Sequence, residues 1–281
     1  MKVLVTGGAG FIGSNLISRL LSEGCEVTSI DNYSLGLHEN ELEGCTYIKG
    51  DLSDIHSLKE DFEVIFHLAA LSRIQPSFDK PYETYKANVE GTQHVCDFAR
   101  KTRAKVIYAG SSSRWHNPHI SPYATYKHVG EEICKMYRKC FELDIEIVRF
   151  YNVYGPSEIV DGDYAAVIGL WRRLIKQGKP LTIVGDGEQR RDFTHVEYIV
   201  DGLLRIATSD QKNEDAWELG TGSNYSLNEV YEMFRERFNC EKVYIPEQRG
   251  NYRRTLRENN DASERLGWKP VDRLKQYILS L

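Results

Sequence analysis

Tyr123 and Lys127 stand four residues apart in the segment SPYATYKHVG, and three consecutive serines, Ser111–Ser113, lie shortly before them. Residues four apart lie on one face of a helix, so the phenol and the ammonium would be neighbours. A free tyrosine has a pKa of about 10, but a nearby positive charge favours the phenolate. Lowering that pKa to about 7 requires roughly 4 kcal/mol. The pattern indicates a tyrosine base flanked by hydroxyls; a surface Tyr/Lys pair is the alternative.

A glycine-rich segment, TGGAGFIG at 6–13, lies between the first expected strand and the first expected helix. It matches G-x-G-x-x-G through Gly8, Gly10 and Gly13, and a second spacing begins at Gly7. Glycines allow a tight turn, and the free N–H groups of the helix start hold a pyrophosphate. Asp31 ends the second expected strand, where a carboxylate binds a ribose 2′-OH and repels a 2′-phosphate. The combination predicts an NAD site, and a positive nicotinamide ring would favour the Tyr123 phenolate further.

Short β-branched runs alternate with amphipathic stretches along the first half of the chain. The runs at 2–6, 26–30, 46–50, 63–69, 105–110 and 145–152 read as strands, and the stretches at 11–24 and about 82–102 read as helices. This alternation predicts an α/β fold with a doubly wound parallel sheet of the Rossmann type. We expect residues 1–155 to form this domain, with 193–220 returning to it. Residues 156–281 are expected to form a smaller α/β substrate domain.

Composition narrows the classes of partner. The 36 basic and 41 acidic residues give a net charge of −5, which does not favour binding to nucleic acid. No apolar run approaches the roughly 18 residues of a membrane span, and no secretory signal is visible. Six cysteines without a C-x-x-C pair read as reduced thiols of a cytoplasmic protein. His116, His119 and His128 lack carboxylates or cysteines at metal-binding spacing, so no metal is expected.

Taken in order, the motifs resemble those of extended short-chain dehydrogenases/reductases of the nucleotide-sugar epimerase/dehydratase family. The resemblance runs from Met1 to about Trp268. The motifs that carry it are TGGAGFIGS (6–14), DNYS-x-G (31–36), Asp51-Leu52, HLAA (67–70), Asn88 in NVEGT, SSS (111–113), Y-x-x-x-K (123–127), RFYNVYGP (149–156), GDGEQRRDF (185–193) and LGWKP (266–270).

The resemblance implies a role for each matching residue. Tyr123 would be the base, Lys127 its tuner and a ribose ligand, and Ser111 the hydroxyl that holds the sugar oxygen. Asn152 and Arg191 would hold the diphosphate; Arg249 is a weaker candidate, because QRGN replaces the usual R-P-G-[DE] and shifts the arginine by one place. The implied NAD contacts, besides Tyr123 and Lys127, are Gly7, Gly10, Phe11, Ile12, Gly13, Asp31, Asn32, Ser34, Gly36, Asp51, Leu52, Leu68, Ala69, Ala70, Asn88 and Phe150.

The serine run bears on the reaction. Ser112 and Ser113 take the places where 4,6-dehydratases of this family carry Asp and Glu, and a serine hydroxyl cannot replace that acid and base at neutral pH. The two serines are therefore expected to bind the sugar, and the resemblance implies epimerisation, most simply at C4 of a UDP-hexose. A dehydratase, decarboxylase or ketosugar reductase of the same fold is the alternative, as is a non-catalytic NAD-binding regulator.

Two further expectations concern substrate size and assembly. Thr255 falls where C4-epimerases of this family that exclude N-acetyl sugars carry a large residue, so a 2-acetamido group is expected to fit. The segment between Ser113 and Pro122 is shorter than usual for the family, so either the site is more open or another segment closes it. The apolar stripes of the helices at 82–102 and 122–141 permit a homodimer built on a four-helix bundle, as the resemblance implies.

Overall fold

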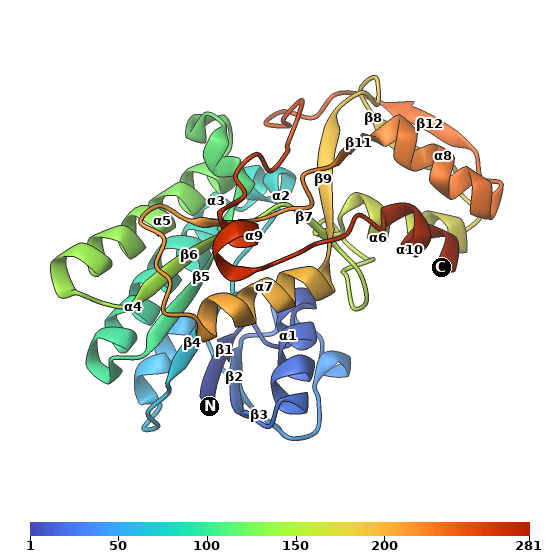
Figure 1. Cartoon of the computed structure of the whole chain (residues 1–281). Helices are drawn as coiled ribbons and strands as arrows, with labels where there is room; N and C mark the ends of the chain where they lie inside the picture. The colour runs from blue at the N-terminus through green and yellow to red at the C-terminus, as the bar shows by residue number, and fades with distance from the viewer.

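Seven parallel strands form the central sheet of the computed structural model, which describes residues 1–281. Their order across the sheet is β10-β6-β5-β4-β1-β2-β3. The strands are β1 (Lys2–Thr6), β2 (Glu26–Asp31), β3 (Cys45–Lys49), β4 (Val64–His67), β5 (Lys105–Ser111), β6 (Ile145–Phe150) and β10 (Trp217–Leu219). The predicted doubly wound parallel sheet is therefore confirmed (Figure 1).

Helices cover both faces of this sheet (Figure 1). On one face, α1 (Phe11–Ser22) and α7 (Val196–Thr208) pack on the sheet and share a core of 21 buried residues with it. On the other face, α4 (Gly91–Thr102) and α5 (Pro122–Phe141) share a core of 18 buried residues with the same strands. Because strands buried on both faces carry apolar residues continuously, runs such as VIF in β4 need no alternating pattern.

The helix predicted at about 82–102 is interrupted by a π-helical turn. It begins as α3 (Pro81–Tyr85), passes through the π turn Lys86–Glu90 and continues as α4. From Val89 onward its apolar stripe is buried within the chain, whereas Tyr82 remains 65% exposed. Most of that stripe therefore packs on the sheet of its own chain.

The expected strand at 145–152 is two strands. β6 ends at Phe150, and β7 (Asn152–Tyr154) pairs with β9 (Arg190–His195) in a different sheet. Between them, the Tyr151 hydroxyl donates to Glu218 at 2.9 Å, which holds the crossing point against β10. The chain thus passes directly from the first sheet into the smaller unit.

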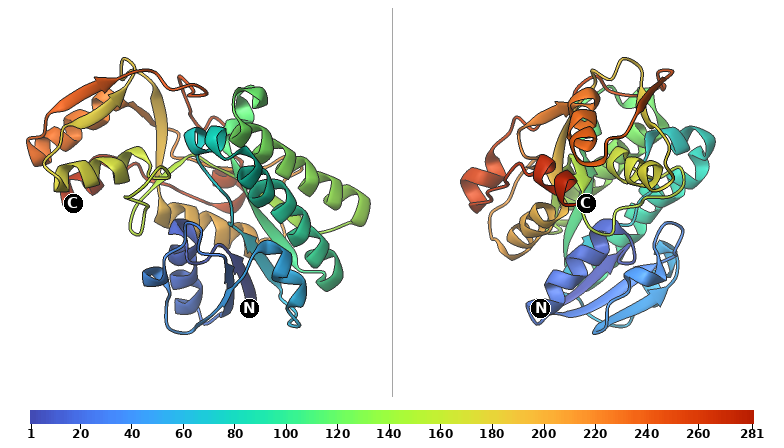
Figure 2. Two further views of the ribbon diagram at one scale, coloured as in Figure 1. Left: turned by 180° about the vertical axis from the view of Figure 1, so that it is seen from behind. Right: turned by 90° about the vertical axis from the view of Figure 1, so that its right-hand side faces the viewer.

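The smaller unit has its own core of 12 buried residues. Its strands form a sheet in the order β11-β9-β7 and a parallel pair, β12-β8, with α6, α8 and α10 packed around them (Figures 1 and 2). The remaining elements are α2 (Ile74–Asp79), α6 (Val167–Lys176), β8 (Leu181–Val184), β11 (Asn224–Ser226), α8 (Leu227–Phe238), β12 (Lys242–Ile245), α9 (Asp261–Leu266) and α10 (Leu274–Ser280). No helix combines the length and apolar character required to cross a membrane.

Candidate active site

A cavity of about 1100 Å³ lies at the carboxyl ends of β1, β2, β4 and β5 and is closed on its far side by the smaller unit. This is the edge of a doubly wound sheet where ligands bind. A pocket for one drug-sized molecule has roughly 300–1,000 Å³, so a dinucleotide and a second ligand can share this space. All the residues that the sequence placed in the site line the cavity except Asn88 and Arg249.

The glycine loop is shaped for a close backbone approach. Gly7 has φ +75°, and a Cβ there would lie 2.8 Å from the backbone nitrogen of Ala69. A Cβ on Gly13 would lie 2.2 Å from the Gly7 carbonyl oxygen. No side chain caps the N-terminus of α1, which starts after Gly10, so its first N–H groups remain free for an anion. These features fit a pyrophosphate.

Asp31 is held at the end of β2 by backbone groups. Its two carboxylate oxygens accept from the N–H groups of Ala9 at 3.0 Å and Tyr33 at 2.8 Å. Burial raises the pKa of Asp31, and these two hydrogen bonds oppose that rise. Beside it, Asn32 donates to Asp51 at 2.7 Å. The chain itself orients this carboxylate, as recognition of a ribose hydroxyl requires.

Tyr123 donates a hydrogen bond to the Ser111 hydroxyl at 3.1 Å. The same Ser111 oxygen accepts from the N–H of Ser113 at 3.1 Å, because Ser111 caps the short 3₁₀ turn that follows β5. Ser111 is thus the serine of the run that contacts Tyr123. Burial raises the pKa of Tyr123, whereas the Ser111 hydrogen bond and the charge of Arg73 lower it.

Lys127 lies on the same face of α5 but is directed elsewhere. Its Nζ donates to the carbonyl of Ala109 at 2.8 Å and lies 5.3 Å from the centre of the Tyr108 ring. Burial lowers the pKa of Lys127 to about 8, and Glu131 opposes that shift. In this structure, the Ser111 hydrogen bond and the charge of Arg73 are the influences that lower the pKa of Tyr123.

Asn152 and Arg191 meet on the wall formed by the smaller unit. The Asn152 amide donates to the Thr255 hydroxyl at 3.1 Å and to the Asp192 carbonyl at 3.1 Å. The Arg191 guanidinium donates to the Arg190 carbonyl at 2.9 Å rather than to a carboxylate, and burial lowers its pKa to about 10. A partly buried guanidinium without a carboxylate suits phosphate oxygens.

Comparison with known proteins agrees with this arrangement. The model of the NAD dependent epimerase/dehydratase family matches residues 3–220. The chain belongs to this family. Its predicted membership and its cofactor, NAD, are thereby confirmed.

Individual members of the family resemble the chain over most of its length. A UDP-glucose 4-epimerase of Mycolicibacterium smegmatis is 33% identical over 99% of this chain and 96% of its own. A UDP-N-acetyl-alpha-D-glucosaminuronate decarboxylase of Bacillus cytotoxicus is 34% identical over 82% of this chain and 78% of its own. The structure of the UDP-N-acetylglucosamine 4-epimerase of Methanobrevibacter ruminantium superposes with a TM-score of 0.91 at 30% identity, covering 99% of this chain and 96% of that one.

Two residues that the family resemblance placed in the site lie elsewhere. The Asn88 amide donates to the Leu71 carbonyl at 3.0 Å and accepts from the Leu71 N–H at 2.9 Å, so it supports the loop after β4 from behind. The Arg249 guanidinium lies 3.7 Å from the centre of the Phe78 ring and does not line the cavity. The one-residue shift in QRGN turns this arginine toward α2.

Three charged residues escaped the sequence analysis. Arg73 lines the cavity and donates through Nε to the Tyr164 carbonyl at 2.8 Å, without a carboxylate partner. Glu158 also lines the cavity; burial raises its pKa to about 7, although Arg172 at 3.1 Å opposes the shift. Asp192 is buried and accepts from the N–H groups of Thr221, Gly222 and Arg257. Only Asp192 had a sequence signal, its place in the RRDF motif.

Proposed function

We propose that this protein is an NAD-dependent epimerase that inverts C4 of a hexose carried on UDP. The hydrogen bond between Tyr123 and Ser111, inside one cavity with the glycine loop and Arg191, is the observation that carries the proposal. NAD, when bound, supplies the hydride acceptor that oxidises C4 and the donor that reduces it again. The glycine loop, Asp31 and Asn32 would hold this cofactor.

Side chains of the protein remove the proton of the C4 hydroxyl and later return it. Tyr123, as the phenolate, removes the proton of the C4 hydroxyl while C4 loses its hydride, and it returns that proton when the ketone is reduced on its other face. Ser111 holds the same sugar oxygen through its hydroxyl. Lys127 and the Ala109 carbonyl fix the α5 face that presents Tyr123. Arg191 and Asn152 anchor the diphosphate, so that the sugar can rotate without leaving.

Dehydration or decarboxylation is the alternative within the family. A decarboxylase among the relatives and a carboxyl with a raised pKa, Glu158, in the cavity wall favour testing it directly. An epimerase run in heavy water with UDP-glucose gives product without deuterium at C4, C5 or C6. Deuterium at C5 with loss of water from the product mass would identify a dehydratase, and loss of carbon dioxide from UDP-glucuronate a decarboxylase. NMR and mass spectrometry of the products separate these outcomes.

Thr255 bears on the size of the sugar. It is buried, lines the cavity and holds Asn152 through its hydroxyl. Because the side chain is small, both UDP-glucose and UDP-N-acetylglucosamine should be substrates. Thr255→Tyr should reduce turnover of the N-acetyl sugar by roughly 10–200-fold relative to UDP-glucose. Turnover of UDP-glucose alone by the parent protein would contradict this assignment.

We further propose how the chain divides these tasks and how it assembles. Residues 1–155 with 193–220 hold NAD, and 156–281 hold the nucleotide sugar. A homodimer in which the helix at 82–102 and α5 form a four-helix bundle is supported by the exposed Tyr82, Met136 and Phe141 on these helices. Light scattering at micromolar concentration should give twice the mass of the chain. We also place the protein in the cytoplasm, because its six cysteines are scattered without a C-x-x-C pair, as is typical of reduced thiols.

A further inference from the structure

A short segment of the smaller unit, residues 248–252, reaches across to the first unit beside Ser113. Arg249 lies on the Phe78 ring of α2, and its carbonyl accepts from the Gln75 amide at 2.8 Å. Gly250 has φ +76°, and a Cβ there would lie 3.0 Å from Ile74 and 3.2 Å from the Ile120 carbonyl oxygen. The segment therefore packs closely on α2 and on the shortened stretch before Pro122.

This segment presents Tyr252 to the cavity. The Tyr252 ring stacks on His116 with centres 3.8 Å apart and planes 11° apart. Tyr252 is 9% exposed and lines the cavity together with Ser113. Tyr123 and Arg191 both contribute to the electrostatic surroundings of its phenol. Tyr252 thus lies near both the group proposed to act at C4 and the group proposed to hold the diphosphate.

Two hydroxyls of this wall lack a hydrogen-bond partner. The Tyr252 hydroxyl and the Ser113 hydroxyl are both buried, and neither has a partner at hydrogen-bond distance within the chain. They lie close enough to each other that Ser113 lowers the pKa of Tyr252. Buried polar groups are nearly always hydrogen-bonded, because an unpaired donor in the interior is costly. Both side chains line the cavity, so a polar ligand there can pair with both. A pyranose ring carries several hydroxyls and meets that need.

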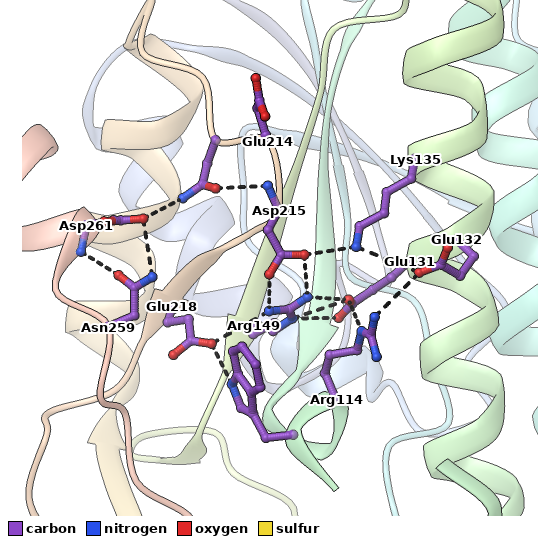
Figure 3. A network of polar contacts seen from close by, with 12 residues as sticks. Arg114, Glu131, Glu132, Lys135, Arg149, Glu214, Asp215, Glu218, Asn259 and Asp261 are labelled. Atoms are coloured by element: carbon purple, nitrogen blue, oxygen red, sulfur yellow. Dashed lines mark hydrogen bonds and ion pairs between the residues drawn. The ribbon is translucent and has the colours of Figure 1, made fainter. Parts of the chain in front are cut away.

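The stretch that carries Ser113 and His116 is anchored at its other side. The Trp115 indole donates to Glu218 at 2.6 Å, and the buried Arg149 guanidinium lies 5.0 Å from the centre of the Trp115 rings. Arg149 in turn pairs with Glu131 of α5 at 2.8 Å and with Asp215 at 2.8 Å (Figure 3). The stretch that carries His116, on which Tyr252 stacks, is therefore fixed to the sheet and to α5, the helix that carries Tyr123.

We propose that Tyr252 is a sugar-binding residue that closes the pyranose subsite and donates a hydrogen bond to a hydroxyl of the ring. It does so beside the stretch after Ser113, which is expected to be shorter than usual for the family. This inference rests on the proposed function, since it assumes a nucleotide sugar in the cavity. Burial raises the pKa of Tyr252 above its ordinary value, so the phenol stays protonated and remains a donor throughout the neutral range.

Equilibrium binding tests this assignment without turnover. UDP-glucose and UDP are titrated separately into the NAD-loaded Tyr123→Phe protein, with and without Tyr252→Phe. Loss of one hydrogen bond to the sugar should raise Kd for UDP-glucose by about tenfold and leave Kd for UDP within twofold. Tyr244→Phe is the matched control, because Tyr244 is half exposed and its hydroxyl bonds to Asn228 outside the cavity wall.

A second variant keeps the test decisive if Tyr252→Phe has a small effect. His116→Ala removes the ring that supports Tyr252 and should likewise weaken UDP-glucose selectively, with an unchanged melting temperature. Unchanged Kd values in both variants, or equal losses for UDP-glucose and UDP, would overturn the assignment of Tyr252 to the sugar. Failure of the parent protein to bind UDP-glucose at all is a different result, and it would overturn the proposed function as well.

Discussion

The cofactor side and the sugar side of the cavity differ in how fully the chain satisfies its own polar groups. On the cofactor side, both oxygens of Asp31 accept backbone N–H groups and Asn32 is bonded to Asp51. On the sugar side, the hydroxyls of Ser113 and Tyr252 and one oxygen of Glu158 are buried without a partner. Neither Arg73 nor Arg191, which line the same side, forms an ion pair with a carboxylate.

This difference suits a cofactor that stays bound through many turnovers and a sugar substrate that is exchanged at each one. A preorganised site costs little reorganisation when its ligand binds, so the cofactor side is suited to hold NAD through many turnovers. Unpaired groups on the sugar side await a ligand that supplies their partners, and they reject molecules that do not. The first of the five variants below acts on a group that both sides share, and the others act on one side each, in order of decreasing expected effect.

Tyr123→Phe removes the group that the two sides share. We expect turnover of UDP-glucose to fall by about 10²–10⁴-fold, because general base catalysis contributes on that scale. NAD content and melting temperature should stay close to those of the parent, since the ring still fills its place and only the bond to Ser111 is lost. Activity assays, nucleotide released on denaturation and circular dichroism provide the measurements. Full activity in this variant would refute the proposed mechanism.

Gly13→Ala is expected to break the cofactor side. A Cβ at this position would lie 2.2 Å from the Gly7 carbonyl oxygen and 2.7 Å from the Gly8 Cα, and backbone atoms cannot yield as a flexible side chain does. The protein should lose its bound NAD and about 1–3 kcal/mol of unfolding free energy. Gly10→Ala is the milder comparison, because its Cβ would meet only the Gly7 oxygen at 3.2 Å. Equal NAD content in all three proteins would contradict the assigned loop geometry.

Arg191→Gln should weaken the sugar side while leaving the cofactor side intact. Loss of a charged hydrogen bond to the diphosphate is expected to raise KM for UDP-glucose about 10–100-fold, with NAD retained. Arg190→Gln is the neighbouring control. Arg190 pairs with Glu229 at 2.9 Å and bonds Asn224, so its loss should lower the melting temperature rather than raise KM. Steady-state kinetics and thermal unfolding distinguish the two roles.

The cofactor side was also the easier one to predict from the sequence. Its determinants are local: the glycine spacing, the strand end at Asp31 and the helical spacing of Tyr123 and Lys127 all lie within short segments. The sugar side depends on segments that meet only in the folded chain, such as His116 with Tyr252 and Asn152 with Thr255. No periodicity or motif records those contacts.

The directions in which individual side chains point could not be predicted from the sequence either. Asn88 lies in the expected helix, but the π turn around it directs its amide to Leu71 rather than to the cavity. Arg249 lies in the expected segment, but its guanidinium stacks on Phe78. The positions of Arg73 and Glu158 beside the cavity follow from how the smaller unit meets the sheet. Tertiary packing therefore decided the function of these residues.

Arg73→Gln tests the sugar side through the pH dependence of kcat/KM. The charge of Arg73 lowers the pKa of Tyr123, so removing it should move the rising limb of the kcat/KM profile to higher pH. Activity at neutral pH would then fall and recover at alkaline pH. Arg73→Lys retains the charge and should leave the limb in place. A loss in Arg73→Gln that is equal at every pH would assign a purely structural role to this arginine.

Glu158→Gln has the smallest expected effect, which is measured as a change in the free energy of unfolding. The pKa of Glu158 is about 7 in the folded protein, above its ordinary value of 4.5, because burial penalises the carboxylate. Between these two pH values the folded state binds more protons than the unfolded state, so the free energy of unfolding falls as pH rises. The fall begins near the lower value and is complete above pH 7. Replacement by glutamine removes it.

The variant should therefore gain stability relative to the parent between pH 5 and pH 8, by at most about 3 kcal/mol. Arg172, which loses its carboxylate partner at 3.1 Å, reduces this gain at the higher pH. Urea unfolding at both pH values measures the difference. Glu214→Gln is the control, since Glu214 is exposed and should leave the slope unchanged. If the free energy of unfolding varied with pH in the same way in Glu158→Gln and in the parent, the Glu158 carboxyl would already be ionised at pH 5. Burial on the sugar side would then not destabilise its carboxylate.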